Sequence, residues 1–352
     1  MIQVVDPSAF TPPYDHALCS ALARAGASVE LVTSRFAYGE VPEPDGYEIR
    51  ELFYRHARGG AGSRTRRLFK FAEHVPDMLR LRRGAGEVVH FQWLDVQWLD
   101  ASLLPRRPTV LTAHDLLPRE PRPGQVRAQR RLYERVDAVV VHSEYGRRQL
   151  EAIGVPATVI HHGAFEHLTR LRGSLPPELP PTDAPVVLFF GLLRPYKGLE
   201  TLLAAWRGIE GAELWIVGRP MISLDTSSAS RVRLVPRFVD DREAAALFAR
   251  ADIVVLPYTR TERLDFSGVL ATGLAFAKPM VVSEIGGFGE VGAAQMVPPG
   301  DVAALHEALV ALLDDPPARA RLSEAARAAA AGPYSWDEAA RKTLALYNAL
   351  TR

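Results

Sequence analysis

The segment Val186-Val-Leu-Phe-Phe-Gly-Leu-Leu-Arg-Pro-Tyr-Lys-Gly198 decides the fold that the sequence predicts. Its first five residues form an apolar run without alternation, which is typical of a parallel strand covered on both faces. Gly191 then allows a tight turn, and Gly198 precedes an amphipathic stretch at 199–206 that predicts a helix. A buried strand that leads through a glycine turn into a helix is the repeating unit of a doubly wound α/β domain.

The same rhythm of short β-branched runs and longer helical stretches extends over most of the chain. The further strands it predicts are residues 29–33, 88–91, 110–112, 138–142, 158–160, 214–217, 232–235, 253–256 and 280–282. The chain has 352 residues, more than the roughly 250 to 300 at which a single hydrophobic core stops growing. The sequence therefore predicts the α/β class, with two doubly wound, Rossmann-like parallel-sheet domains.

A proline-rich stretch separates the two sets of strands. Residues 173–184 contain four prolines, which prevent regular structure and stiffen the connection. We therefore predict a first domain at 1–172, a hinge at 173–184 and a second domain at 185–334. Ser335 is a suitable N-cap for a last helix at 335–352, whose apolar side chains are expected to pack back on the first domain.

Composition indicates an ordinary globular protein. The chain is 47% hydrophobic and 24% charged, with a net charge of +1, so no nucleic-acid partner is predicted. Its single cysteine, Cys19, has no internal disulfide partner, which favours a reducing compartment. The first ten residues lack the pattern of a signal peptide, and no run of about 18 apolar residues occurs. We therefore predict a cytoplasmic protein, peripheral at the inner face of the membrane if it binds lipid.

One segment, from Arg55 to Arg83, departs from this charge balance. It carries nine Lys and Arg residues against two acids, interleaved with apolar side chains: Leu68, Phe69, Phe71, Met78 and Leu79. Such a segment is suited to an anionic membrane surface or an acidic acceptor. A solvated helix face in an arginine-rich sequence is the alternative interpretation.

The residues after strand 186–190 are the first candidates for chemistry, because open parallel sheets bind ligands outside the carboxyl ends of their strands. Arg194 and Lys197 place two cations there, about one turn apart. Arginine offers a planar fork and lysine a mobile point charge, a pair that suits a diphosphate and stabilises it more as it departs. The alternative is a loop with two solvated cations.

The stretch Gly191-Leu-Leu-Arg-Pro-Tyr-Lys-Gly-Leu-Glu-Thr-Leu-Leu-Ala-Ala-Trp206 resembles the donor loop of the family 4 GT-B glycosyltransferases. Other stretches are similar to that family in the same order: 112–115, 141–146, 161–163, 214–218, 247–258 and 278–287. The resemblance implies two domains facing a central cleft and transfer of a sugar from a nucleotide diphosphate donor with retention. It also implies no metal ion or other cofactor, and the chain has no Asp-x-Asp motif.

The chain departs from the family at its acidic pair. The two glutamates, eight positions apart, would fall at Leu264 and Thr272, and neither residue is acidic. The resemblance makes Asp265 and Glu262 candidates for the lost sugar contact, and Thr272 a candidate for the ribose contact.

A helix is expected to begin at Ser267, Gly268 and Val269, where free backbone N–H groups would point at phosphate without any carboxylate. We therefore interpret the segment as a variant donor site. The chain after strands 214–217 and 232–235 usually builds the wall for the base in this family, and the residues in those places are Arg219, Arg237 and Phe238.

In the first domain, His114 follows strand 109–113 beside Asp115, and the resemblance implies that it touches the donor sugar or stabilises charge near the reacting carbon. His90 follows another strand and is the weaker candidate. The remaining acceptor-side candidates are Tyr14, Asp15, His16 and Trp93. For His114, His90 and Trp93, packing inside the domain is the alternative.

Three functions other than sugar transfer are alternatives for such a chain. A nicotinamide-dependent dehydrogenase is not favoured, because it needs Gly-x-Gly-x-x-Gly after a strand and we expect none there. A sugar-nucleotide epimerase of the same fold would release nucleotide diphosphate without any acceptor. A non-catalytic sugar-nucleotide or membrane-associated binding protein is the third alternative, suggested by the missing acidic pair. Hydrolysis of the donor distinguishes a transferase from a binding protein.

Overall fold

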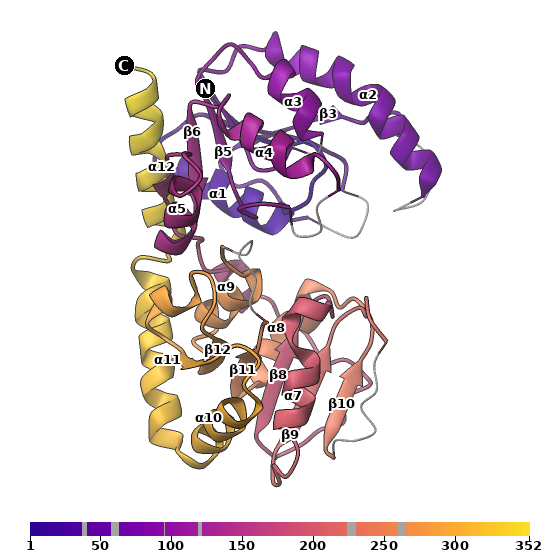
Figure 1. Ribbon diagram of the computed structural model, residues 1–352, viewed down its shortest axis with the longest axis vertical. Coiled ribbons are helices and arrows are strands. Elements are labelled where there is room, and N and C mark those ends of the chain that lie inside the picture. The colour runs from indigo at the N-terminus through magenta and orange to yellow at the C-terminus, as the bar shows by residue number, and fades with distance from the viewer. Residues whose placement is uncertain (37–40, 58–62, 95, 119–121, 224–229, 260–264) are drawn as a thin grey trace. The chain divides into compact units, whose positions relative to one another are not determined.

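A computed structural model describes residues 1–36, 41–57, 63–94, 96–118, 122–223, 230–259 and 265–352 (Figure 1). The chain divides into two units. The N-terminal unit comprises Met1–Gly163, Asp265 and Trp336–Arg352, and the C-terminal unit comprises Ala164–Glu262 and Phe266–Ser335. None of the helices in these ranges has the length and hydrophobicity needed to cross a lipid bilayer.

The N-terminal unit is built on a parallel sheet with the strand order β3-β2-β1-β4-β5-β6-β7. Its strands are β1 (Ile2–Asp6), β2 (Val29–Ser34), β3 (Glu48–Phe53), β4 (Val88–Phe91), β5 (Thr109–Thr112), β6 (Ala138–Val141) and β7 (Thr158–Val159). Its helices are α1 (Pro12–Arg24), α2 (Arg64–Arg82), α3 (Gln97–Leu103), α4 (Gln125–Tyr133), α5 (Glu144–Glu151) and α12 (Trp336–Leu350). Strand β1 pairs with both β2 and β4, so the strand order reverses between β1 and β4. Doubly wound sheets bind ligands at this switch point.

The C-terminal unit repeats the architecture with the strand order β10-β9-β8-β11-β12-β13, again parallel. Its strands are β8 (Val186–Phe190), β9 (Glu213–Val217), β10 (Val232–Val235), β11 (Ile253–Leu256), β12 (Met280–Ser283) and β13 (Gln295–Val297). Its α-helices are α6 (Glu166–Thr169), α7 (Leu199–Ala205), α8 (Asp241–Arg250), α9 (Gly268–Ala275), α10 (Val302–Asp314) and α11 (Pro316–Ala331). The switch point of this sheet lies between β8 and β11.

The predicted fold class is confirmed, because both sheets are parallel, covered by helices and doubly wound. The apolar runs coincide with strands that are buried on both faces, such as β4 and β9. Two edge strands did not stand out in the sequence. Strand β3 has the sequence EIRELF and is partly exposed, and β13 has only three residues, so neither forms an apolar run.

The chain passes from the N-terminal to the C-terminal unit between Gly163 and Ala164, so the predicted hinge at 173–184 lies within the C-terminal unit. It returns at helix α12, which lies along α1 in the N-terminal unit (Figure 1). The ring centres of Trp336 on α12 and Tyr14 on α1 are 5.0 Å apart. Helix α12 is therefore an integral part of the N-terminal unit.

The sequence contains one Gly-x-Gly-x-x-Gly motif after a strand, contrary to the prediction. Gly287-Phe-Gly-Glu-Val-Gly292 does have the Gly-x-Gly-x-x-Gly spacing after a strand. It forms a short 3-10 helix, η2 (Phe288–Val291), and leads into β13 rather than into an α-helix. The dinucleotide fingerprint requires its glycines to open an α-helix, so this segment lacks the necessary context.

Candidate functional site

The end of strand β8 holds the two predicted cations. Lys197 is 6% exposed, and its Nζ donates a hydrogen bond to the Phe190 carbonyl at 3.2 Å. The same Nζ lies 5.2 Å from the centre of the Tyr258 ring, within cation–π range. Arg194 is half-buried, and its guanidinium forms no hydrogen bond or ion pair with any residue that the structure describes. The site therefore combines a cation that is held in place with one that is available to a ligand.

Two glycines allow close approaches of the backbone near Arg194 and Lys197. Gly191 has a φ of 100°, and a Cβ there would lie 2.8 Å from Lys197 Nζ. Gly198, which has a φ of 70°, approaches the Pro257 carbonyl oxygen so closely that a Cβ would lie 1.9 Å from it. Any side chain at Gly198 would therefore force apart the segments that follow β8 and β11.

Helix α9 begins at the same edge of the sheet. A Cβ on Gly191 would lie 3.5 Å from Val269 Cγ2, in the first turn of α9. The N-cap Ser267 makes no capping hydrogen bond through its side chain, and its hydroxyl lies 3.3 Å from that of Tyr258. The first N–H groups of a helix have no intrahelical partner and carry partial positive charge. Arg194, Lys197 and this helix end therefore make the switch point between β8 and β11 suited to an anion such as a diphosphate.

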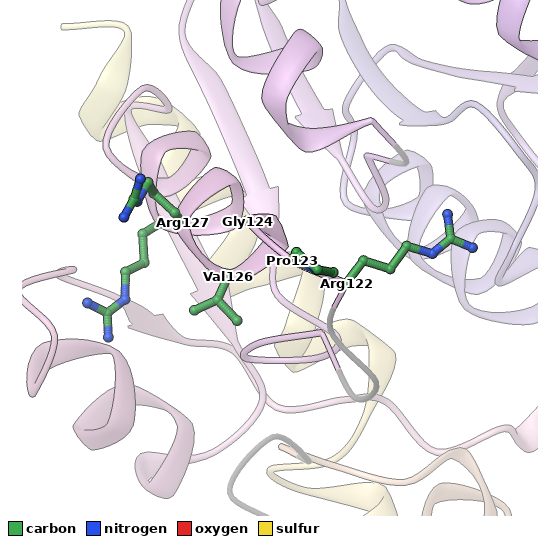
Figure 2. Close-up of a pocket in the computed structure, with 6 residues that line it drawn as sticks. Arg122, Pro123, Gly124, Val126 and Arg127 are labelled. Carbon is green, nitrogen blue, oxygen red and sulfur yellow. The ribbon is translucent and has the colours of Figure 1, made fainter.

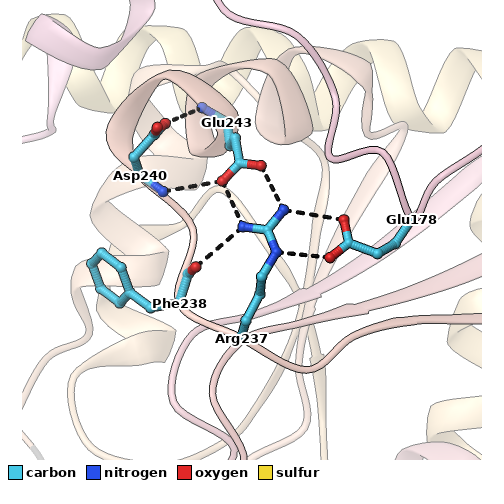
Figure 3. A network of polar contacts seen from close by, with 5 residues as sticks. All are labelled: Glu178, Arg237, Phe238, Asp240 and Glu243. Atoms are coloured by element: carbon cyan, nitrogen blue, oxygen red, sulfur yellow. Dashed lines mark hydrogen bonds and ion pairs between the residues drawn. The ribbon is translucent and has the colours of Figure 1, made fainter.

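The three residues predicted to contact the base differ in availability. Arg219 follows β9, is exposed, and has no side-chain partner among the described residues. Phe238 is 66% exposed. Arg237 is held between Glu178 and Glu243, with N–O distances of 2.7 Å and 2.6 Å (Figure 3). These hydrogen bonds raise the pKa of Arg237 and lower the pKa of both carboxyls.

Two of the residues predicted to replace the acidic pair, Asp265 and Thr272, lie in different units. Asp265 belongs to the N-terminal unit, is fully buried, and accepts hydrogen bonds from the His142 N–H and the Ser143 hydroxyl. Thr272 is 7% exposed, and its hydroxyl donates to the Gly268 carbonyl at 2.8 Å inside α9. Glu262, like the aligned position Leu264, lies outside the described residues.

In the N-terminal unit, His114 follows β5 and lies in a group of rings around Tyr14. The Tyr14 ring centre is 4.7 Å from that of His114, 4.9 Å from that of His162 and 5.5 Å from that of His142. His142 Nε2 lies 3.3 Å from His114 Nδ1, and His114 Nε2 lies 3.1 Å from Gln92 Oε1. These hydrogen bonds fix the orientation of the His114 ring.

Burial keeps these histidines neutral. It lowers the pKa of His142 to about 4 and that of His162 to about 3. Burial and the neighbouring imidazoles lower the pKa of His114 well below its usual value of 6.5. A neutral imidazole offers one donor and one acceptor at pH 7. Within the described part of the chain, no group of three or more His, Cys, Asp or Glu side chains is placed to hold a metal ion.

A cavity of about 310 Å³ lies beside His114. Trp93 lines it and stacks on His114, with ring centres 5.0 Å apart and an interplanar angle of 15°. Gln125 and Gln129 of α4 add amide groups to the wall. The volume is at the lower end of the range of small-molecule sites. An aromatic wall with polar groups at its edge suits a ligand the size of a monosaccharide.

His90 is satisfied inside the unit. Its Nδ1 lies 2.6 Å from the Tyr347 hydroxyl, and its Nε2 lies 2.7 Å from the Thr112 hydroxyl. Burial lowers its pKa to about 3. Both ring nitrogens are therefore used, and the ring links β4, β5 and α12.

The other two acceptor-side candidates are buried in α1. Burial raises the pKa of Asp15 well above its usual value, and the neighbouring carboxylate of Asp6 adds to the effect. His16 is 5% exposed, with its Nδ1 2.5 Å from the Tyr47 hydroxyl. Among the five candidates on this side, Tyr14 and Trp93 contact His114, whereas the described contacts of Asp15, His16 and His90 lie elsewhere.

Two residues of these sites were not among the predictions. His142 follows β6 directly, and Tyr258 lies two residues beyond β11. Both follow strand ends, which is the signal that selected His114 and Arg194. Applied to every strand, that signal identifies them, although only the structure shows that His142 contacts His114 and that Tyr258 contacts Lys197.

Comparison with known families agrees with this arrangement. Residues 14–164 match the family described as "Glycosyltransferase Family 4", and residues 184–315 match "Glycosyl transferases group 1". The first region contains His114 and Trp93, and the second contains Arg194 and Lys197. The two matched regions thus contain the two sites.

Individual relatives cover the chain to different extents. A phosphatidyl-myo-inositol mannosyltransferase of Mycobacterium leprae is 34% identical over 234 residues, 61% of this chain and 60% of that relative. The chain spans about half the length, 49%, of other curated relatives. Among solved structures, a sucrose-phosphate synthase of Thermosynechococcus elongatus has a TM-score of 0.76 at 19% identity, covering 99% of this chain and 98% of that one. Anabaena HepE in complex with UDP has a TM-score of 0.72 at 17% identity, covering 99% and 100%. These structural similarities establish the fold.

Proposed function

The chain belongs to the family 4 glycosyltransferases of the GT-B fold, and we propose that it transfers a hexose-type sugar from a nucleotide diphosphate donor to an acceptor hydroxyl. In this proposal the C-terminal unit binds the donor nucleotide, and the N-terminal unit binds the acceptor and contributes His114 to the sugar. The configuration at the anomeric carbon is retained, as the family resemblance implies.

The observation that carries the proposal is the set of positive groups at the end of β8. As the bond between the anomeric carbon and the diphosphate oxygen breaks, negative charge accumulates on the leaving diphosphate. Arg194, Lys197 and the N-terminus of α9 stabilise that charge more in the transition state than in the ground state. Lys197 is already held by the Phe190 carbonyl, so it needs little reorganisation during the reaction.

We propose that the reaction needs no metal ion, because the protein's own cations neutralise the diphosphate. The sequence also has no Asp-x-Asp motif to hold a divalent ion beside a nucleotide. Transfer is therefore expected to continue in excess EDTA. Loss of activity in EDTA, with recovery on adding a divalent cation, would contradict this part of the proposal.

His114 is assigned to the sugar. Its neutral imidazole lies in the wall of the 310 Å³ cavity. Its Nδ1 is engaged by His142 and its Nε2 by Gln92, so a sugar hydroxyl would take the place of the Gln92 amide at Nε2. A neutral ring also adds no positive charge near the anomeric carbon, which itself becomes positive as the bond to the leaving group breaks. The low pKa of His114 therefore favours the proposed role.

The base and the sugar are proposed from relatives. One curated relative is named a GDP-mannose:glycolipid 4-beta-D-mannosyltransferase, and one structural neighbour binds UDP-glucose. We therefore propose GDP-mannose and UDP-glucose as the first donors to test. Arg219 and Phe238 are exposed after β9 and β10, and they are suited to hydrogen-bond to and stack on a base.

An anionic membrane surface is a further proposed partner, through α2. Leu68 and Phe71 on this helix are 72% and 59% exposed, beside the exposed Arg64 and Arg67. The later part of α2 is anchored, because His74 Nε2 lies 2.5 Å from the buried Asp100 carboxylate. An amphipathic basic helix of this kind binds at the lipid interface. Of the predicted basic segment, Arg58 lies outside the described residues.

Donor turnover without acceptor tests the proposed function. The protein is incubated with GDP-mannose or UDP-glucose, and free sugar and nucleotide diphosphate are quantified. A transferase releases sugar slowly to water, and Arg194→Ala is expected to abolish the release. An epimerised sugar product would indicate an epimerase. A thermal shift, worth roughly 2.7 kcal/mol at a hundred times the dissociation constant, without any turnover would indicate a binding protein.

Vesicle flotation tests the membrane partner separately. The protein is expected to float with vesicles that contain phosphatidylglycerol and not with pure phosphatidylcholine. Leu68→Ser with Phe71→Ser is expected to abolish flotation while leaving donor hydrolysis unchanged. Flotation that persists in this double variant would contradict the assignment to α2.

A further inference from the structure

Residues of helix α4 line two separate cavities in the N-terminal unit. Gln125 and Gln129 line the 310 Å³ cavity beside His114. Val126, Arg127 and Arg130 face a second pocket of about 690 Å³, which Arg122, Pro123 and Gly124 complete. Figure 2 shows Arg127 on one side of Gly124 and Val126, and Arg122 on the other. A ligand in the cavity and a group in this second pocket would therefore meet the same helix.

The arginines of the second pocket have no carboxylate partner within the described ranges. Arg122, Arg127 and Arg130 are exposed, and their guanidinium groups form no ion pair or hydrogen bond there. The nearest acids in the sequence are Glu134, which forms no ion pair with Arg130, and Glu120, which lies outside the described residues. Like charges three residues apart on a helix, as Arg127 and Arg130 are, destabilise it.

Some other arginines of the chain have carboxylate partners. Arg147 on α5 pairs with Glu144 at 2.7 Å and with Glu151 at 2.6 Å. Arg237 is likewise held between two carboxylates. No ion pair offsets the repulsion on α4 within the described part of the protein, and an anionic ligand would supply a direct counter-charge.

We propose that Arg127 and Arg130 of this pocket bind a phosphate group carried by the acceptor. This inference rests on the proposed transferase function. The acceptor lies along α4 with its phosphate on the arginines, and its reacting hydroxyl is directed toward the cavity beside His114. Arginine is suited to this role, since its planar fork binds phosphate oxygens in pairs. The phosphate is either on a soluble ester or in a lipid headgroup.

The test compares two charge-matched double variants. Arg127→Gln with Arg130→Gln removes two cations from the pocket. Arg131→Gln with Arg135→Gln removes two exposed cations that do not line it. The probes are sn-glycerol 3-phosphate, measured by calorimetry, and phosphatidylglycerol in phosphatidylcholine vesicles, measured by flotation. Circular dichroism and thermal unfolding check that each variant is folded.

We expect wild type and the Arg131/Arg135 variant to bind alike, and the Arg127/Arg130 variant to bind the probe about tenfold or more weakly. Weakening seen only with glycerol phosphate identifies a soluble ester, and weakening seen only with vesicles identifies a headgroup. Three results would overturn the proposal: no binding of either probe by wild type, equal weakening in both variants, or displacement of the probe by GDP or UDP.

The binding assay contains no donor, so its result is independent of sugar transfer. Probe binding through Arg127 and Arg130 in a chain that turns over no donor would contradict the proposed function and still support an anion site on α4. Donor turnover without probe binding would contradict the anion site alone.

Discussion

The ends of strands β8 and β5 occupy similar positions in two similar sheets, yet their chemistry is opposite. At β8, two cations and a helix N-terminus gather beside a glycine turn. At β5, burial keeps a group of histidines neutral. The doubly wound topology therefore selects the place of a site, whereas the first few side chains after each strand select its charge.

The difference also divides the proposed reaction into two tasks. The charged edge at the end of β8 stabilises an anionic leaving group. The neutral edge at the end of β5 accommodates a sugar without repelling a positive reaction centre.

The largest effect is expected at the charged edge. Arg194→Ala and Lys197→Ala each remove about 2 to 4 kcal/mol of transition-state stabilisation, about 30- to 1000-fold in kcat/KM. Steady-state kinetics with the active donor measure this loss. Arg207→Ala, an exposed arginine just beyond α7 in the same unit, is the matched control and should retain wild-type rates. Equal rates in all three variants would contradict the proposed role of Arg194 and Lys197 in stabilising the leaving diphosphate.

Gly198→Ala is expected to disturb the same edge through the backbone. The new Cβ would lie 1.9 Å from the Pro257 carbonyl, at a residue with a φ of 70°. We expect a loss of more than about 2 kcal/mol in the free energy of unfolding, measured in urea.

Gly208→Ala provides the control for this experiment. Gly208 has a φ of 81°, and no atom lies within 4 Å of its Cβ position. The substitution therefore carries the dihedral cost of roughly 1 to 2 kcal/mol without a clash. If both variants lost the same stability, the close approach at Gly198 would be contradicted.

The neutral edge predicts a pH dependence. Because burial lowers the pKa of His162 to about 3, the folded state favours the neutral ring. Its stabilising contribution is present above the usual pKa of 6.5 and is lost as pH falls from there toward 3. The loss between pH 7 and pH 5 is about 2 kcal/mol.

His162→Gln removes this dependence. Unfolding in urea at pH 7 and pH 5, followed by tryptophan fluorescence, gives the stability difference between variant and wild type at each pH. That difference is expected to shift by about 2 kcal/mol in favour of the variant at pH 5. Comparison with wild type cancels the contributions of Asp6 and Asp15. A difference that does not change with pH would show that the ring is not held neutral.

The smallest effect is expected at Arg237. Its guanidinium is already satisfied by Glu178 and Glu243 (Figure 3), so Arg237→Gln should change the donor KM very little. Arg219→Gln is the matched substitution at an arginine with no partner in the described part of the chain, and it should raise KM more, up to about fivefold. Donor titrations of the two variants decide between them. A larger effect at Arg237 would mean that the donor displaces the carboxylates.

The local sequence was sufficient to place Arg194 and Lys197 after strand β8. Strand, glycine, Arg194, Lys197 and helix follow one another within about twenty residues, so the apolar run and the glycines place the cations at the strand end without knowledge of the rest of the chain. The fold class followed from the same local pattern.

Contacts between segments far apart in the chain could not be predicted from the sequence. Nothing local indicates that Arg237 meets Glu178, 59 residues away, or that the Asp265 carboxylate binds 123 residues back at the His142 N–H. His90 was chosen because it follows a strand, but its ring is engaged by Tyr347, 257 residues away. Position after a strand predicts that a side chain lies near the binding edge, whereas tertiary packing decides whether that side chain is available.

Helix α12 has a consequence for the synthesis of the protein. It completes the N-terminal unit, yet the ribosome makes it only after the entire C-terminal unit. Domains usually fold in the order in which they are synthesised. Here the surface of α1 that receives Trp336 stays uncovered on the nascent chain while the later unit can already mature. The first unit to be translated is therefore the last to become complete, and an N-terminal fragment ending at Gly163 would expose that apolar surface to chaperones and proteases.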